Sequence, residues 1–196
     1  MFGPLLKGAH VTLRPGREED ADHFVRWFAD TEVTRYLNRR MAVALYQEQE
    51  FLKKIGESKD DVWWMIDAQG KAIGATGIHL INWLDANAMT GIIIGEKDSW
   101  GRGFGTEATR LMLDHAFGTL GLHRVALTVF EFNERAIRAY RRCGFVVEGR
   151  ARESIWREGR WWDELAMSVI ASEWRGRGAR VAPRALPKVP AEPVAG

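Results

Sequence analysis

Apolar side chains recur along the first third of the chain at the spacing of amphipathic helices. Three acidic residues at positions 18–20 precede apolar residues spaced three or four apart, which predicts a helix with its acidic residues at the positive end of the helix dipole. The same spacing predicts a second short helix over residues 32–37 and a third over 43–55. The third helix is expected to bury Leu45, Phe51, Leu52 and Ile55.

Short apolar runs and strict alternation predict strands in the rest of the chain. They indicate seven strands, at residues 10–14, 62–66, 72–82, 88–95, 122–130, 145–149 and 165–170. Two more helices are predicted after the fourth and fifth strands, one from Phe104 and one over residues 133–142. An antiparallel meander followed by strand–helix–strand–helix–strand predicts an α+β (mixed α/β) fold: a mixed, mostly antiparallel sheet of about seven strands flanked by helices.

Composition indicates one domain. Of the 196 residues 46% are hydrophobic, enough for one full core, and we expect a single domain over residues 1–174. Residues 175–196 hold Gly, Ala, Pro and Arg with little to bury, which predicts a disordered basic tail. A net charge of +2 argues against nucleic acid as the main partner, and no apolar run approaches the ~18 residues of a membrane span. Because the one cysteine, Cys143, excludes an internal disulfide, we expect a cytoplasmic protein.

A glycine-rich turn stands between the apolar strand Gly91-Ile-Ile-Ile-Gly95 and the helix from Phe104. Its sequence is Ser99-Trp-Gly-Arg-Gly-Phe-Gly-Thr-Glu-Ala108, with glycine at 101, 103 and 105. A strand, a glycine turn and a helix start present free backbone N–H groups and the positive end of a helix dipole to an anion. Arg102 adds a positive charge, so the turn predicts a phosphate site. Taken alone, the glycines also fit a tight turn that needs them only for its geometry, an explanation that carries less weight than the phosphate site.

A second motif lies about thirty residues further on. It is Asn133-x-x-Ala136-x-x-x-Tyr140-x-x-x-Gly144-Phe145. Residues seven apart return to the same face of a helix, so Asn133 and Tyr140 share one stripe. Taken singly, Asn133 is explained as a helix N-cap and Tyr140 as a core residue with its hydroxyl at the rim.

Together, the turn and the helix motif resemble the GNAT superfamily of acyl-CoA-dependent N-acyltransferases. Within it, the chain is most similar to the RimJ/RimL-like branch and its polyamine-acetylating relatives. The resemblance runs from about residue 10 to 174 and includes Leu122-His-Arg-Val125 and Arg157-Glu-Gly-Arg-Trp-Trp-Asp163. It implies a GNAT-like fold, acetyl-CoA as cosubstrate and no metal. One departure is Trp100, where the superfamily usually has Gln or Arg.

The resemblance assigns roles to particular residues. The backbone amides from Trp100 to Thr106 would hold the coenzyme A pyrophosphate, Ile93 and Gly95 would pair with the pantetheine arm like an added strand, and Tyr140 would protonate the leaving thiolate. The coenzyme-binding residues expected on this basis are Ile93, Gly95, Trp100, Gly101, Arg102, Gly103, Phe104, Gly105, Thr106, Asn133, Ala136, Tyr140 and Arg142. Of these, Asn133 would bind a pantetheine amide and Arg142 the outer phosphate, although a solvated surface position explains Arg142 as well.

The residue that would deprotonate the acceptor amine is not marked by the motifs. Neutralising a lysine-like amine at pH 7 costs about 4 to 5 kcal/mol, so such an acceptor needs a base. Relatives often carry an acidic residue early in the strand before the turn, where this chain has Met89 and Thr90. The alternatives are Glu96, which we name as the candidate catalytic base, His79 and Glu131.

The predicted function is transfer of the acetyl group of acetyl-CoA to a primary amine, either a protein N-terminus such as that of a ribosomal protein or a small amine. The alternative is a catalytically silent acyl-CoA-binding regulatory module, which the missing strand acid favours. Five tryptophans, at 63, 64, 83, 161 and 162, are expected either in core and subunit contacts or as aromatic walls of the acceptor groove. The tryptophan-rich hairpin near residue 160 favours a homodimer.

Overall fold

The computed structural model describes residues 1–175 and contains one eight-stranded sheet of order β1-β2-β3-β4-β5-β6-β8-β7. The strands are β1 (Leu6–Lys7), β2 (Val11–Arg14), β3 (Val62–Ala68), β4 (Lys71–Asn82), β5 (Asn87–Ile94), β6 (Arg124–Phe130), β7 (Val146–Arg157) and β8 (Arg160–Ile170). The helices are α1 (Ala21–Ala29), α2 (Thr31–Thr34), α3 (Leu45–Glu57), α4 (Phe104–Gly118), α5 (Glu134–Arg142) and α6 (Ala171–Arg175), with 3₁₀ turns η1 (Glu18–Asp20) and η2 (Lys97–Ser99). No helix within residues 1–175 is both long and apolar enough to cross a membrane. Apart from Arg175, the last residue of α6, the predicted tail lies outside the described residues.

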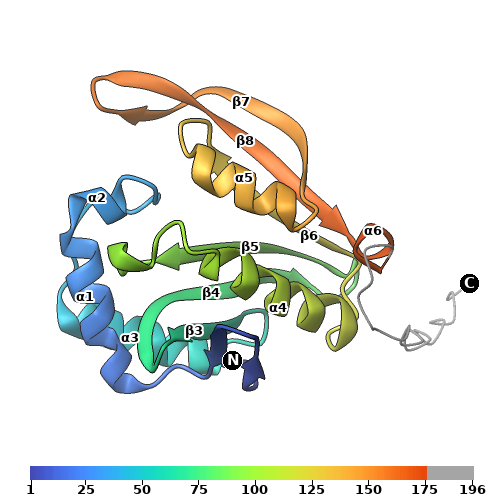
Figure 1. The fold of residues 1–196 in the computed structure, drawn as a ribbon, viewed down its shortest axis with the longest axis horizontal. Coiled ribbons are helices and arrows are strands. Elements are labelled where there is room, and N and C mark those ends of the chain that lie inside the picture. The colour runs from blue at the N-terminus through green and yellow to red at the C-terminus, as the bar shows by residue number, and fades with distance from the viewer. Residues whose placement is uncertain (176–196) are drawn as a thin grey trace, which may run out of the picture.

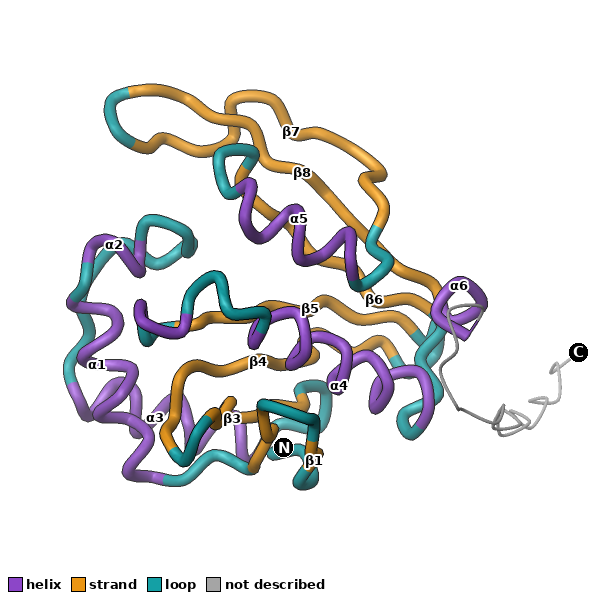
Figure 2. Tube along the Cα trace, viewed as in Figure 1, coloured by secondary structure: helices purple, strands orange, loops and turns teal. Residues whose placement is uncertain are grey.

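Strand β3 is buried on both of its faces, because helices cover the sheet from two sides. Val62, Trp64 and Ile66 pack into a core shared with α4 and α5, whereas Trp63 and Met65 pack into a second core shared with α1 and α3. Alternate side chains of a strand point to opposite faces, so one strand serves both cores. Figure 2 shows α1, α2 and α3 grouped together and apart from α4, α5 and α6.

Strands β5 and β6 form the one parallel pair of the described sheet, and they part early. Their pairing covers only three residues of β5, from Asn87 to Met89. Beyond Met89 strand β6 stays paired with β8, whereas β5 stays paired with β4. Figure 1 shows the result: the two strands lie side by side near α6 and diverge toward α2 and the tip of the β7–β8 hairpin. The divergence leaves the edge of β5 without a neighbouring strand.

The predicted fold class is confirmed, with one strand more than the seven expected. The extra strand, β1, has two residues, which is too short to give a periodic signal. The last hairpin is longer than predicted, because the exposed residues of β7 are mostly polar or charged and do not alternate with apolar ones. For α3 the predicted burial of Leu45 and Phe51 is wrong, since they are 40% and 36% exposed.

The predicted burial of Leu52 and Ile55 is confirmed, and helix α3 also buries Glu48. These positions are spaced four and three apart and therefore form one stripe. At about 100° per residue, Leu45 and Phe51 flank Glu48 by about 60° on either side. The predicted buried face is therefore too wide and leaves out the residue at its centre, Glu48.

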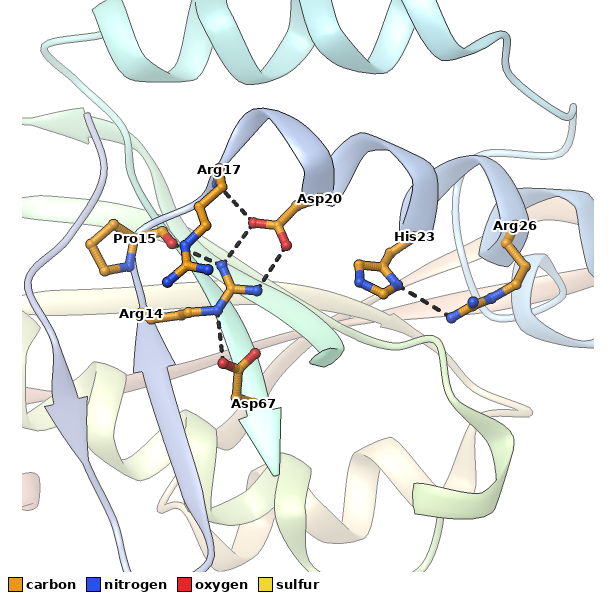
Figure 3. Close-up of polar contacts among 7 residues, drawn as sticks. All are labelled: Arg14, Pro15, Arg17, Asp20, His23, Arg26 and Asp67. Atoms are coloured by element: carbon orange, nitrogen blue, oxygen red, sulfur yellow. Dashed lines mark hydrogen bonds and ion pairs between the residues drawn. The ribbon is translucent and has the colours of Figure 1, made fainter. Parts of the chain in front are cut away.

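A buried group of ion pairs fixes the start of α1 to the sheet. Arg14 on β2 donates from Nη1 and Nη2 to the two carboxylate oxygens of Asp20, both at 2.8 Å, and from Nε to Asp67 Oδ2 at 2.7 Å (Figure 3). Asp20 also accepts from the backbone N–H of Arg17 at 2.7 Å. These bonds raise the pKa of the Arg14 guanidinium above its ordinary value despite its burial. Charge-assisted bonds with this fork geometry are strong and directional.

Replacing Asp20 by alanine should strongly destabilise the fold. The change leaves the Arg14 guanidinium without its two-bond partner in a buried position, which typically costs about 3 to 5 kcal/mol. The measurement is the free energy of unfolding in urea, with Asp22→Ala as the matched control, since Asp22 is an exposed residue in the first turn of α1, next to Asp20. Equal stability of the Asp20 and Asp22 variants would contradict the assigned role.

Candidate active site

A cavity of about 510 Å³ occupies the gap where β5 and β6 diverge. It is lined by β5 and β6, by the turn before α4 and the start of that helix, by α5, and at its other end by α1 and α3. Most of the coenzyme-binding residues expected from the sequence line it: Ile93, Trp100, Gly101, Gly103, Phe104, Gly105, Thr106, Asn133, Ala136, Tyr140 and Arg142. Gly95, Glu96 and Arg102 do not line it.

The start of α4 has the geometry of an anion site. Gly101 and Gly103 have φ of 74° and 85°, values that side-chain-bearing residues rarely adopt, and Gly103 is the N-cap of the helix. Helical hydrogen bonding begins with the N–H of Glu107, which donates to Gly103 O at 3.0 Å. The N–H groups of Phe104, Gly105 and Thr106 therefore have no helical acceptor and stand at the positive end of the dipole.

Two residues of the turn are placed differently from the sequence-based expectation. The N–H of Trp100 donates to Lys97 O at 2.9 Å, so it is not free to bind a phosphate. The Arg102 guanidinium lies over the ring of Phe104, 4.8 Å from its centroid, and donates to Gln69 Oε1 at 3.4 Å. Arg102 thus stands outside the cavity, on the exposed side of the turn.

The open edge of β5 presents different backbone groups from those expected. The N–H of Gly95 donates to Ile73 O of β4 at 2.9 Å, and the expectation that it is free for a ligand is wrong. Backbone groups alternate between the two sides of a strand, so those of Ile93 also face β4. Those of Ile92 and Ile94 face the gap. A shift of one residue exchanges the two sides, and a sequence motif alone does not fix that register.

The indole of Trp100 occupies one of the two positions on this open edge. Its Nε1 donates to Ile94 O at 2.7 Å, and the Arg135 guanidinium lies 4.0 Å from its ring centroid. The backbone of Ile92 remains facing the cavity. The Trp100 side chain therefore closes the outer end of the β5 edge.

Helix α5 contributes a cap and a phenol. The side chain of Asn133 caps the helix by accepting from the N–H of Ala136 at 3.2 Å, which leaves its amide nitrogen without a hydrogen bond to any described residue. The hydroxyl of Tyr140 likewise makes no hydrogen bond within residues 1–175, although the side chain is buried at the cavity wall. Burial raises the pKa of Tyr140 to about 12, so the phenol stays protonated at neutral pH.

Of the three base candidates, one lines the cavity. Glu96 accepts from Trp27 Nε1 at 2.8 Å and is paired with Arg26, so its carboxylate ties the end of β5 to α1. Glu131 is bound to Arg150 and to the N–H of Asp163. His79 lines the cavity, and burial lowers its pKa, which favours the neutral imidazole.

The end of the cavity formed by α1 and α3 is aromatic, with Phe24, Phe28, Phe51 and Trp63 in its wall. Of the tryptophans considered in the sequence, Trp63 is the one that lines it. Trp64 lies in the opposite core with Nε1 donating to Pro4 O at 2.9 Å, and Trp83 is exposed with Nε1 donating to Asp60 Oδ1 at 2.9 Å. Trp161 and Trp162 lie on the β7–β8 hairpin outside the cavity wall.

Glu48 is a cavity-lining residue that sequence reasoning missed. It projects from α3 into the cavity wall and is only 2% exposed. Its burial raises the pKa of the carboxyl group, an effect partly offset by Arg39, whose Nη1 lies 3.6 Å from Oε1. Its position on the stripe of Leu52 and Ile55 is the signal by which it could have been found.

The chain belongs to the GNAT acetyltransferases. Residues 10–146 match the family model described as an acetyltransferase (GNAT) domain. Acetyl-CoA is the cosubstrate of such proteins, and the free N–H groups at the start of α4 together with the open edge of β5 fit it.

Particular relatives extend this likeness. The spermidine N(1)-acetyltransferase of Vibrio cholerae is 32% identical over 130 residues, covering 66% of this chain and 75% of the relative. A putative ribosomal N-acetyltransferase of Bacillus subtilis, YdaF, is 32% identical over 107 residues, covering 55% of this chain and 58% of the relative. The crystal structure of the V. cholerae spermidine N-acetyltransferase in complex with CoA and spermine superposes with a TM-score of 0.79 at 26% identity, covering 86% of this chain and 99% of that one.

Replacing Gly103 by alanine should reduce both stability and acetyl-CoA binding. No heavy atom lies within 4 Å of a Cβ built there, so the penalty comes from the φ of 85°. The left-handed conformation costs an alanine about 1 to 2 kcal/mol, and relaxing it would turn the α4 N–H groups away from the phosphates. Differential scanning fluorimetry with and without acetyl-CoA measures both effects.

Gly105→Ala is the matched control for this variant. Gly105 lies inside α4, and the nearest atom to a built Cβ is Ile94 Cγ1 at an ordinary 3.6 Å. Alanine there should be neutral or stabilising by up to about 1 kcal/mol. An equal loss in the two variants would show that space at the turn, and not the backbone conformation, requires glycine.

Replacing Glu48 by glutamine should stabilise the protein at neutral pH. A carboxyl group with a raised folded-state pKa stabilises the fold below its unfolded-state pKa, and that contribution is lost as pH rises through the folded-state value. Removing the charge should raise the free energy of unfolding at pH 7 and with it Tm. The gain should vanish on acidification. Glu50→Gln, on the exposed face of α3, is the control; a lower Tm for Glu48→Gln would contradict the prediction.

Proposed function

We propose that this protein transfers the acetyl group of acetyl-CoA to a primary amine by direct attack, with Tyr140 as general acid. The observation that carries the proposal is the Tyr140 hydroxyl, which lies at the cavity wall without a hydrogen bond to any described residue. The hydroxyl is accessible from the cavity and has no partner among the described residues, so it is free to act on a bound molecule. Bound acetyl-CoA supplies the activated thioester.

Backbone groups hold the coenzyme in this proposal. The N–H groups of Phe104, Gly105 and Thr106, with those of the preceding glycine turn, bind the pyrophosphate. The backbone of Ile92 pairs with the pantetheine arm, and its N–H donates to the thioester carbonyl oxygen as negative charge develops there. The free amide nitrogen of Asn133 donates to a pantetheine carbonyl, and Arg142, at the cavity wall, serves the outer phosphate.

Two side chains move protons. Tyr140, protonated because its pKa is about 12, gives its proton to the sulfur as the C–S bond breaks and the C–N bond forms. His79 accepts the proton that the attacking amine loses, because it is neutral at pH 7 and lines the cavity. His79 Nδ1 lies 3.5 Å from Asp61 Oδ1, which orients the ring. Glu96 is a weaker candidate for this role, since its carboxylate is held by Arg26 and Trp27 outside the cavity.

A small amine is the favoured acceptor class. The aromatic wall and Glu48 suit a cationic molecule, and spermidine is the substrate named for one relative. A protein N-terminus remains the alternative acceptor. We also propose that the protein is cytoplasmic and a homodimer: the edge strand β7 and the hairpin expose Val146, Val147, Trp156 and Trp161, an apolar set suited to a second copy.

Replacing Tyr140 by phenylalanine should lower kcat about 100-fold or more, with little change in acetyl-CoA affinity, because the ring still packs while the acidic proton is gone. The measurement is thiol release with a panel of amines and N-terminal peptides, combined with the acetyl-CoA-induced rise in Tm. Tyr46→Phe, an exposed tyrosine of α3, is the control. An unchanged melting curve at saturating acetyl-CoA would refute the proposal. Binding without turnover for every amine would favour the silent acyl-CoA-binding module.

A further inference from the structure

We propose that Glu48 and the ring of Phe28 form a binding site for a second, cationic group of the acceptor, and that Arg39 occupies this site until the acceptor displaces it. The inference rests on the proposed function and identifies the chemical class of its acceptor: a diamine, one nitrogen of which reacts while the other stays protonated. It concerns the end of the cavity formed by α1 and α3, away from the coenzyme-binding turn.

The carboxylate of Glu48 has no hydrogen-bond donor within the described residues and is open to the cavity. The side chain is 2% exposed and lines the cavity, and within residues 1–175 no group donates a hydrogen bond to it. The one described cation within 4 Å is Arg39 Nη1, at 3.6 Å, which is too long for a hydrogen bond. Its oxygens are not sealed inside the protein, since Asp67 Oδ1 is the one fully buried side-chain oxygen or nitrogen without a partner within residues 1–175. The cavity side of Glu48 therefore has room for a donor of positive charge.

The buried Asp20 shows what a satisfied carboxylate looks like in this fold. It accepts hydrogen bonds from Arg14 and from the N–H of Arg17 at 2.7 to 2.8 Å. Glu48 is as deeply buried but has only the longer contact with Arg39. The hydrogen bonds of Asp20 show that this carboxylate stabilises the fold. Glu48 has no such hydrogen bonds, so stabilisation of the fold does not explain its position.

Aromatic rings surround the same position. The guanidinium of Arg39 lies 4.8 Å from the centroid of the Phe28 ring, a cation–π distance. Phe24 is 5.7 Å from Phe28 between centroids and continues the wall toward Trp63, at 5.5 Å. A ring face on one side and a carboxylate on the other are the two groups that hold an alkylammonium ion in water-poor surroundings.

Arg39 has the features of an internal cation that an acceptor can replace. It lies in the connection between α2 and α3, its side chain is 44% exposed, and within the described residues it makes no hydrogen bond from its guanidinium. Its contacts with Phe28 and Glu48 are those that a ligand cation would make. Displacing it returns an exposed guanidinium to water, which costs little. An ammonium group can approach closer than Arg39 does and donate to the carboxylate directly.

This chemistry selects against neutral and anionic acceptors. An acceptor whose remote end is uncharged gains nothing from Glu48 and must leave Arg39 in place, and a carboxylate there would be repelled by Glu48. A charge-assisted hydrogen bond combined with cation–π attraction should favour a diamine over a monoamine of equal length by about 10- to 100-fold in affinity.

The test compares two acceptors, 1,4-diaminobutane and n-butylamine, on four variants of the full chain: Glu48→Gln, Arg39→Gln, and the controls Glu50→Gln and Arg40→Gln. Glu48→Gln should raise KM for 1,4-diaminobutane about 10-fold or more while changing kcat less than about 3-fold, and should leave KM for n-butylamine unchanged. Arg39→Gln should lower KM for 1,4-diaminobutane about 2- to 5-fold, because the internal competitor is gone. The controls should leave both constants unchanged.

Calorimetric titration with 1,4-diaminobutane in the presence of coenzyme A measures the same effects without turnover. Tighter binding in Arg39→Gln and weaker binding in Glu48→Gln would support the site even if no amine were acetylated, so the inference and the proposed function can fail separately. Three outcomes would overturn the inference: equal KM changes for the two amines in Glu48→Gln, a loss of kcat without a change in KM, or weaker diamine binding in Arg39→Gln. The first would give Glu48 a general structural role, the second a role in proton transfer, and the third would make Arg39 part of the acceptor site.

Discussion

The early parting of β5 from β6 is the constraint on which the rest of the site depends. A sheet that stayed paired along this edge would leave no cavity between α4 and α5 and no free backbone groups along β5. The two strands are held apart because β6 belongs to an antiparallel group with β8 and β7, whereas β5 follows β4. Unpaired edges are usually a hazard. Here the edge is covered in part by the Trp100 indole and leaves Ile92 facing the cavity.

The fold class, the strand–turn–helix and the cap of α5 could be predicted because each rests on a local pattern. Glycines at 101 and 103 are required by their backbone angles, and Asn133 caps its helix through its own side chain. The register of β5 was mispredicted by one residue, because the direction of a backbone N–H depends on the neighbouring strand and not on the motif. Glu48 was missed because a charged residue on a helix is normally assigned to the solvent side.

The two buried acidic residues illustrate a division between stability and function. Asp20 is bound by Arg14 and holds the N-terminal helices to the sheet, so its charge contributes to the fold. Glu48 has no comparable partner, and burial raises the pKa of its carboxyl group. Sites that are destabilising in isolation are common where a ligand later supplies the missing contacts.

The β7–β8 hairpin reaches across the chain to the segment that follows α2. Arg157 donates to Leu37 O at 2.7 Å, and Arg35 pairs with Glu158 at 2.8 Å, so residues about 120 positions apart in sequence form one rim beside the acceptor end. None of these residues takes part in the phosphate turn, the β5 edge or the Tyr140 helix. Substitutions in this rim can therefore reshape one end of the cavity while the glycine turn, the β5 edge and α5 stay as they are.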